Sequence, residues 1–116
     1  MATDMNKIIV KKYFEMWNTG NIKLADEVLS PAYIDYAHPE IKSIESVKQS
    51  IVKVRDIFPD FNITIDRMIS EDNIVAVLGN ISRTEQEKKA VYKIMWLVTL
   101  VDGKMTELRT GNVILK

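Results

Sequence analysis

The hydrophobic residues of the N-terminal part recur at helical spacing. Five of them lie three and four positions apart: Ile9, Val10, Tyr13, Phe14 and Trp17. This spacing places them along one face of an amphipathic helix, while most charged residues fall on other faces. Gly20 suits the left-handed position that follows a helix end. Asn21 can begin a shorter helix that extends through Leu29 and is terminated by Ser30 and Pro31.

A second stripe with the same spacing predicts a third helix. Its apolar positions are Ile44, Val47, Ile51, Val54 and Phe58. The Ser43 hydroxyl can cap the start of this helix, because serine accepts a hydrogen bond from a backbone N–H in the first turn. Pro59 stops the helix, because proline cannot continue it. Three helices are therefore expected before the first long strand.

Beyond Phe61 the period of the hydrophobic pattern changes to two. Phe61, Ile63 and Ile65 face one way and the polar residues between them face the other, as in a half-buried strand. Further strands are predicted over three segments: Ile74–Ile81, Val91–Val101 and Lys104–Leu115. Helices followed by successive strands indicate an α+β domain, with three N-terminal helices packed in a curved antiparallel sheet.

Two polar segments mark the predicted connections between these strands. The run Ser82–Lys89 is predicted to separate the second and third strands. Asp102 and Gly103 form the strongest local turn signal, because a type I′ hairpin turn requires positive φ angles that Asp-Gly tolerates.

The segment Val91–Val101 is apolar on both of its faces. One face carries Tyr92, Ile94, Trp96, Val98 and Leu100, and the other carries Lys93, Met95, Leu97, Thr99 and Val101. One apolar face can pack on the helices. The second would remain in water unless another sheet covers it, so we expect a homodimer formed through the sheet.

Length and charge narrow the classes of function. The 116 residues fit one domain spanning residues 1–116. The 16 basic and 16 acidic side chains cancel, which gives no electrostatic case for nucleic acid. The longest uncharged apolar run, Ile94–Val101, is far shorter than the ~20 residues that cross a bilayer. Residues 1–6 lack the pattern of a secretion signal, so a cytoplasmic location is predicted.

Four short motifs occur in order along the chain. They are an aromatic stretch ending in Trp-Asn-x-Gly-Asn (Phe14–Asn21), a Pro-x-Tyr-x-Asp-x-x-x-Pro segment (Pro31–Pro39), Phe58-Pro59-Asp60, and Asp102-Gly103-Lys104 followed by Glu107. Together they resemble the SnoaL-like polyketide cyclase family of the nuclear transport factor 2-like superfamily. The resemblance implies a cone-shaped fold with a cup for a small apolar or aromatic molecule, and cyclase or isomerase chemistry without a cofactor.

The chain departs from the family at the residues that carry its chemistry. Characterised cyclases of the family use a histidine and an aspartate on the later strands and the loop between them. Here no histidine follows His38, and no aspartate lies between Asp72 and Asp102. Acid-base chemistry by that particular pair is therefore not expected.

His38 and Glu107 are the candidate catalytic residues. His38 is the only histidine, and an unperturbed imidazole changes its charge near pH ~6.5, which suits proton transfer. The alternative is a loop histidine without a catalytic role. Asp35, Asp66 and Glu107 are carboxylates in or beside strands, where burial can tune an acid or base. One histidine with scattered carboxylates does not supply the three ligands of a metal site, so none is expected.

Arg109 and several aromatic residues are the candidate ligand-binding residues. Glu107 and Arg109 share one strand face, where they either hold a polar group of the ligand or form a weak surface pair. Four rings are the candidates for the cup wall: Tyr13, Trp17, Tyr36 and Trp96. Such rings can equally be plain core.

Two functional hypotheses follow from these residues. The first is a cofactor-independent cyclase, isomerase or hydratase acting on a small apolar carbonyl compound. The second is a non-catalytic ligand-binding or dimeric interaction module, because a fold does not by itself define an activity.

Overall fold

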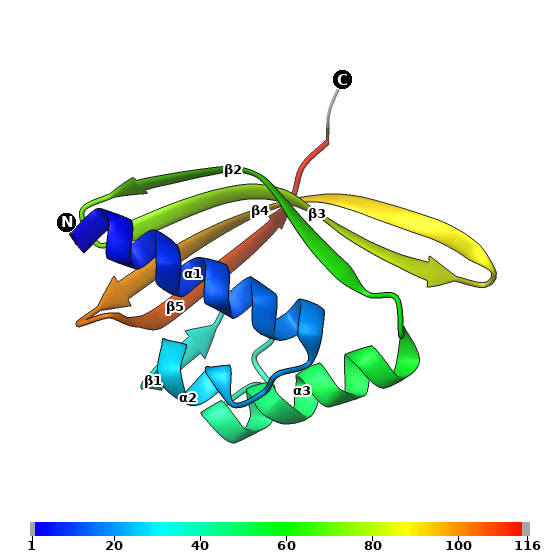
Figure 1. The fold of residues 1–116 in the computed structure, drawn as a ribbon, viewed down its shortest axis with the longest axis horizontal. Coiled ribbons are helices and arrows are strands. Elements are labelled where there is room, and N and C mark those ends of the chain that lie inside the picture. Colours follow the sequence, from blue (N-terminus) through cyan, green and yellow to red (C-terminus); the bar gives the residue numbers. More distant parts are fainter. Residues whose placement is uncertain (1, 115–116) are drawn as a thin grey trace.

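The structure is a computed structural model and describes residues 2–114. Within that range, three helices and five strands follow one another in the chain (Figure 1): α1 (Ala2–Thr19), α2 (Leu24–Val28), β1 (Leu29–Asp35), α3 (Ile44–Ile57), β2 (Asn62–Glu71), β3 (Ile74–Glu85), β4 (Lys88–Val101) and β5 (Lys104–Asn112). The predicted α+β class with a curved sheet is confirmed. Leu115, the last residue of the predicted C-terminal strand, lies outside the described residues.

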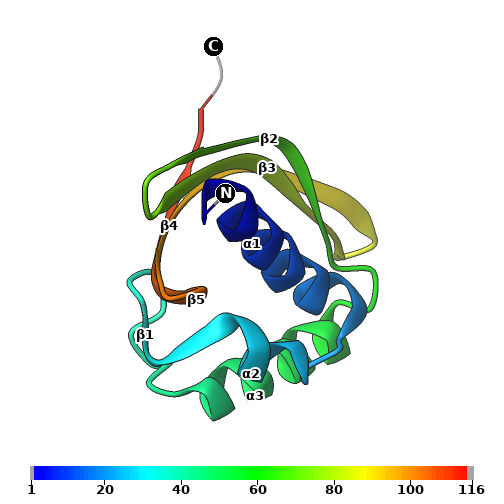
Figure 2. The ribbon, with the colours of Figure 1, turned by 60° about the vertical axis from the view of Figure 1, so that its left-hand side comes forward.

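The five strands form one sheet in the order β1-β5-β4-β3-β2. The sheet bends around α1, and α2 and α3 lie across its open side (Figures 1 and 2). The prediction of an entirely antiparallel sheet is wrong at one edge, where β1 runs parallel to β5. A parallel neighbour is possible there because the long crossover from β1 to β5 contains α3 and three strands.

The predicted second helix is shorter than expected. It has five residues, ends at Val28, and passes directly into β1 at Leu29. The third helix begins as predicted, because the Ser43 hydroxyl accepts a hydrogen bond from the backbone N–H of Ser46 at 3.1 Å. Ser46 completes a capping box by accepting a bond from the Ser43 backbone N–H at 3.0 Å.

The end of α1 is attached to the following elements by polar side chains. Gly20 adopts a φ angle of 78°, and its N–H donates to the Met16 carbonyl at 2.9 Å, which closes the helix. The Asn18 side-chain amide pairs with both backbone groups of Ile63, at 2.6 and 2.8 Å. Arg55 of α3 donates to the Trp17 carbonyl at 3.0 Å. These bonds fix α1 against β2 and α3.

The core lies between α1 and the concave face of the sheet. Val10 and Phe14 of the α1 stripe are fully buried, and so are Val98 and Leu100 of β4. The Phe14 and Trp96 rings lie 4.7 Å apart between centroids, in a tilted arrangement typical of aromatic pairs. None of the helices in the described range has the length and apolarity to cross a bilayer.

The hairpin between β3 and β4 is longer than predicted. Strand pairing continues from Ser82 to Glu85 and resumes at Lys88, although Ser82–Lys89 was expected to be a separating loop. The two turn residues, Gln86 and Glu87, have φ angles of 50° and 68°. They satisfy the geometry of a tight hairpin turn without the glycine that usually marks one. The predicted turn at Asp102 and Gly103 is confirmed, with φ angles of 51° and 76°.

Gly79 allows β2 and β3 to lie close together beneath the Trp96 ring. A Cβ atom at this position would meet the Thr64 carbonyl oxygen at 2.2 Å and the Trp96 ring at 3.1 Å. The first distance is far below van der Waals contact, and a backbone oxygen in a paired strand cannot move aside freely. Glycine is therefore required here by packing.

Gly79→Ala is expected to lower the free energy of unfolding by about 1–3 kcal/mol, because the methyl group overpacks the β2–β3 junction. Urea denaturation followed by tryptophan fluorescence measures this change. Gly111→Ala is the matched control, because a Cβ atom there meets no heavy atom within 4 Å. Equal effects of the two substitutions would contradict the packing argument.

Candidate functional site

A cavity of about 180 Å³ lies between the C-terminal half of α1, α3 and the concave face of the sheet. Its lining residues are Tyr13, Phe14, Trp17, Asp35, His38, Ile41, Ser50, Val54, Phe61, Ile63, Ile81, Arg83, Trp96, Leu108 and Thr110. An engineered cavity of similar volume in another protein holds a benzene ring, so this space suits a molecule of about that size.

Two larger hollows lie on the outer surface. One, of about 650 Å³, runs along α3, and its lining residues include Lys48, Val52 and Asp56. The other, of about 420 Å³, lies beside β1 and the segment after it. Both are open to solvent, and a small ligand bound there would remain largely hydrated. The smaller cavity is the better site because it can remove a ligand from water.

Aromatic side chains form the apolar wall of the cavity. Tyr13, Trp17 and Trp96, three of the predicted ligand-binding residues, all line it. Trp17 packs against Phe61 with 5.8 Å between ring centroids. Flat rings of this kind can contact a cyclic ligand over a large area.

His38 and Asp35 form a polar pair at this cavity. The chain turns immediately after β1, which brings the His38 Nδ1 atom to 3.2 Å from the Asp35 Oδ2 atom. The Asp35 side chain is only 4% exposed, whereas that of His38 is 56% exposed. The Ala37 N–H donates to the other Asp35 oxygen at 3.0 Å. A carboxylate held in this way favours a proton on Nδ1 and leaves Nε2 as an acceptor.

Two buried tyrosines lie close to Asp35. Burial, the largest cause, raises the pKa of Tyr13 to about 12 and that of Tyr33 far above its usual value. The negative charge of Asp35 raises both pKa values further. The two hydroxyls therefore stay protonated at neutral pH. Tyr13 lines the cavity with a neutral hydroxyl. The Tyr33 hydroxyl interacts with that of Tyr13, but it makes no hydrogen bond of regular geometry within the described range.

Three predicted site residues do not line the cavity. Tyr36, Glu107 and Arg109 form a separate cluster, in which the Tyr36 hydroxyl donates to Glu107 Oε2 at 2.7 Å. The Arg109 guanidinium lies 3.9 Å from the centre of the Tyr36 ring. Arg109 and Glu107 are 3.8 Å apart, so they form the surface pair that was one of the two alternatives.

A β-bulge explains the position of this cluster. Regular alternation would place Met105, Glu107 and Arg109 on one face, and Met105 is buried. The register between β4 and β5 shifts at Thr106, because Leu100 pairs with Met105 whereas Thr99 pairs with Glu107. The extra residue reverses the alternation, so that Leu108 faces inward and Glu107 faces the convex surface.

Two residues of the site, Asp35 and Arg83, were not predicted from the sequence. Asp35 was considered only as one of several strand carboxylates, although the spacing Asp-x-x-His was visible. Arg83 was assigned to a loop because Ser82–Lys89 is polar, and its inward direction depends on the hairpin extension. Among the residues that the structure describes, no group of three or more potential ligands could hold a metal ion.

The comparisons with known proteins agree with this architecture. A family model described as SnoaL-like domain matches residues 10–108. The chain belongs to this SnoaL-like family. No curated protein matches the sequence.

Two solved structures illustrate the similarity of the fold. TsrD from Streptomyces laurentii superposes with a TM-score of 0.81 at 14% identity, over 94% of this chain and 88% of that protein. A SnoaL-like polyketide cyclase from Agrobacterium tumefaciens strain C58 superposes with a TM-score of 0.80 at 10% identity, over 93% and 91%. At sequence identities this low, the similarity to these two proteins is a similarity of fold.

Tyr33→Phe is expected to raise the free energy of unfolding by about 1 kcal/mol, because it removes a buried hydroxyl that makes no hydrogen bond of regular geometry in the described range. Urea denaturation measures the change. Tyr36→Phe is a suitable control, since the Tyr36 hydroxyl is bonded to Glu107 and its loss brings no gain. A loss of stability in Tyr33→Phe would contradict this account of the hydroxyl.

Proposed function

We propose that this protein binds a small, largely apolar carbonyl compound in the aromatic cavity and moves a proton on it without a cofactor. The observation that carries the proposal is the contact between Asp35 and His38 at 3.2 Å on the wall of that cavity. A histidine that only faces solvent does not require a buried carboxylate as partner. A cavity that only binds an apolar ligand does not require a base in its wall. Their occurrence together supports acid-base chemistry.

In the proposed reaction His38 is the catalytic base. Its Nε2 atom accepts a proton from the carbon beside the carbonyl group and later returns it. Asp35 is a positioning residue, because it orients the ring through Nδ1 and stabilises the imidazolium that forms. The protonated hydroxyl of Tyr13 can donate a hydrogen bond to the developing oxyanion. The apolar walls exclude water and hold the substrate in a fixed orientation.

The family supports this reaction over a non-catalytic role. The similar protein from Agrobacterium tumefaciens is a SnoaL-like polyketide cyclase, and ring closure of that kind can begin with proton removal beside a carbonyl. A purely ligand-binding module would explain the cavity but would give no role to the contact between Asp35 and His38. A cytoplasmic location remains a prediction.

His38→Gln is expected to lower proton exchange on a ketone by about 100-fold, because the base is removed while the cavity is kept. The measurement is solvent deuterium exchange beside the carbonyl of small ketones such as cyclohexanone and acetophenone in D₂O, followed by NMR. Asp35→Asn should lower the rate as well, and it should shift the ¹⁵N signals of the His38 ring because the favoured tautomer changes.

Glu71→Gln is the control for these variants, because Glu71 is exposed at the end of β2 and does not line the cavity. It should exchange at the rate of the original protein. Exchange that survives His38→Gln unchanged would refute the assignment of the base. Unaltered His38 nitrogen signals in Asp35→Asn would refute the positioning role of Asp35.

We further propose that the convex face of the sheet forms a homodimer. Exposed apolar side chains gather there on neighbouring strands: Ile69, Ile74, Met95, Leu97 and Val101. Glu107 and Arg109 lie on the same face. A surface that carries an apolar centre together with acidic and basic groups can be complementary to itself, as a two-fold interface requires.

Leu97→Lys is expected to convert a dimer into a monomer, because it places a charge at the apolar centre of the interface. Light scattering should give about twice the 13.3 kDa mass of the chain for the original protein and the mass of one chain for the variant. Val52→Lys, an exposed substitution on α3, should remain dimeric. A single-chain mass for the original protein would contradict the proposal.

A further inference from the structure

Arg83 is a positively charged residue on the cavity wall that has no part in the proposed reaction. Its side chain is 30% exposed, and its guanidinium carbon lies 4.3 Å from the centre of the Phe58 ring. The Nε atom donates to Glu85 Oε2 at 2.5 Å. The guanidinium carbon also lies 5.5 Å from the centre of the Tyr92 ring, and Tyr92 interacts with Arg83. Within the described range, the bond to Glu85 is the one Arg83 side-chain bond with regular hydrogen-bond geometry. A guanidinium has five N–H groups, so four remain available to a ligand.

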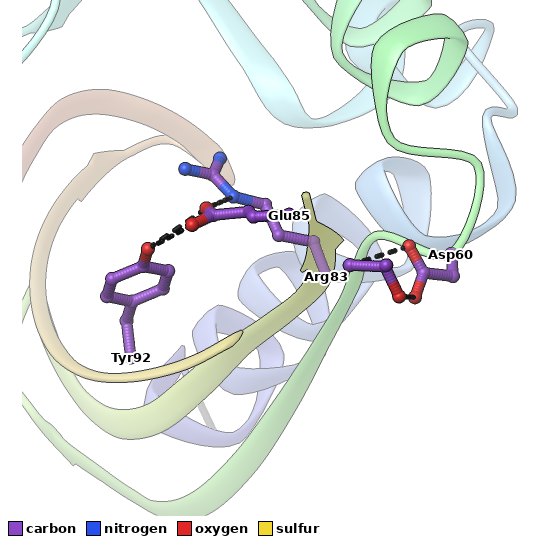
Figure 3. A network of polar contacts seen from close by, with 5 residues as sticks. Asp60, Arg83, Glu85 and Tyr92 are labelled. Carbon is purple, nitrogen blue, oxygen red and sulfur yellow. Dashed lines mark hydrogen bonds and ion pairs between the residues drawn. The ribbon is translucent and has the colours of Figure 1, made fainter. Parts of the chain in front are cut away.

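Two sets of contacts hold Arg83 in this position (Figure 3). The Thr84 backbone and hydroxyl donate to Asp60 at 3.0 and 2.6 Å, which fastens β3 to the loop before β2. These bonds and nearby Lys89 keep the pKa of Asp60 far below its usual range. Since neighbouring side chains in a strand point to opposite faces, fixing Thr84 outside directs Arg83 inward.

Glu85 completes the support of the guanidinium. The Tyr92 hydroxyl donates to both Glu85 oxygens, at 2.8 and 2.9 Å (Figure 3). This bond, and secondarily Arg83, lower the pKa of Glu85. The carboxylate is therefore engaged on the Nε side of Arg83 and leaves the terminal nitrogens free. Phe58 restricts the guanidinium plane through its ring face.

We propose that Arg83 binds the carboxylate of the ligand, so that the protein takes small apolar carboxylates. This inference refines the proposed function, because it concerns the same cavity. The terminal nitrogens of arginine form a planar fork that matches two carboxylate oxygens. Glu85 offsets part of the positive charge, which favours a singly charged group over a phosphate dianion. Asp35, the carboxylate that lines the cavity, is already paired with His38.

The size of the cavity agrees with such a ligand. About 180 Å³ accommodates a single ring or a short branched chain, and the carboxylate can remain near the partly exposed Arg83. The ring would then lie among the apolar walls that include Trp17 and Trp96. One fixed charge and flat walls would define the orientation of the ligand toward His38.

The test compares phenylacetate with phenylacetamide, which have the same ring and differ in charge. Binding is followed by NMR through the indole N–H signals of Trp17 and Trp96, the two tryptophans of the chain. The original protein should bind phenylacetate at least about tenfold more tightly than the amide, as expected for one charge-assisted bidentate pair. This comparison needs no variant and therefore cannot fail through misfolding.

Arg83→Gln should remove the preference for phenylacetate and leave the affinity for phenylacetamide unchanged. Arg83→Lys should retain a reduced preference, because it keeps the charge and loses the planar fork. Arg67→Gln, which removes the same charge from an exposed position on β2 away from the cavity, should bind both probes like the original protein.

Equal affinity of the original protein for the two probes, a preference that survives Arg83→Gln, or no binding of either probe would each overturn the inference. The experiment involves no turnover, so it is separate from the test of His38. A preference for phenylacetate in a protein without exchange activity would retain the role of Arg83 and remove the proposed reaction. Exchange activity in a protein that shows no preference for phenylacetate would retain the proposed reaction and remove the role of Arg83.

Discussion

The packing of α1 into the concavity of the sheet is the constraint on which the rest of the structure depends. Val10 and Phe14 are fully buried only because the strands bend around them, and the Phe14 ring lies against Trp96. At the C-terminal end of α1 the wall consists of stiff aromatic rings, which cannot adjust to fill every space as aliphatic chains do. A hollow therefore remains where α1, α3 and the sheet meet, and the polar residues of the candidate site border it.

Most elements of the fold could be predicted because their signals are local. The stripe of α1, the capping serine of α3 and the turn at Asp102 and Gly103 each depend on a few neighbouring residues. The extension of the β3–β4 hairpin could not be predicted, because its turn residues Gln86 and Glu87 adopt positive φ angles that the sequence does not signal. Long-range pairing along both strands stabilises a turn that local preference disfavours.

The candidate site shows the same division between local and long-range information. Tyr13, Trp17, Trp96 and His38 were candidate site residues with plain structural roles left open, and all four line the cavity. For Glu107 and Arg109 the sequence left the cup and the surface open, because one extra residue in β5 exchanges the two faces of the strand. Such a bulge depends on pairing with β4, which no pattern within β5 reveals.

The two tyrosines beside Asp35 impose an alkaline limit on the fold. Their hydroxyls must stay neutral in the core, and the pKa of Tyr13 is raised to about 12 there, mainly by burial. In the unfolded chain a tyrosine loses its proton near pH ~10. Above that pH the unfolded chain therefore binds fewer protons than the folded one, and the free energy of unfolding falls with each further increase. The same burial that makes Tyr13 a dependable proton donor thus makes the protein sensitive to strong base.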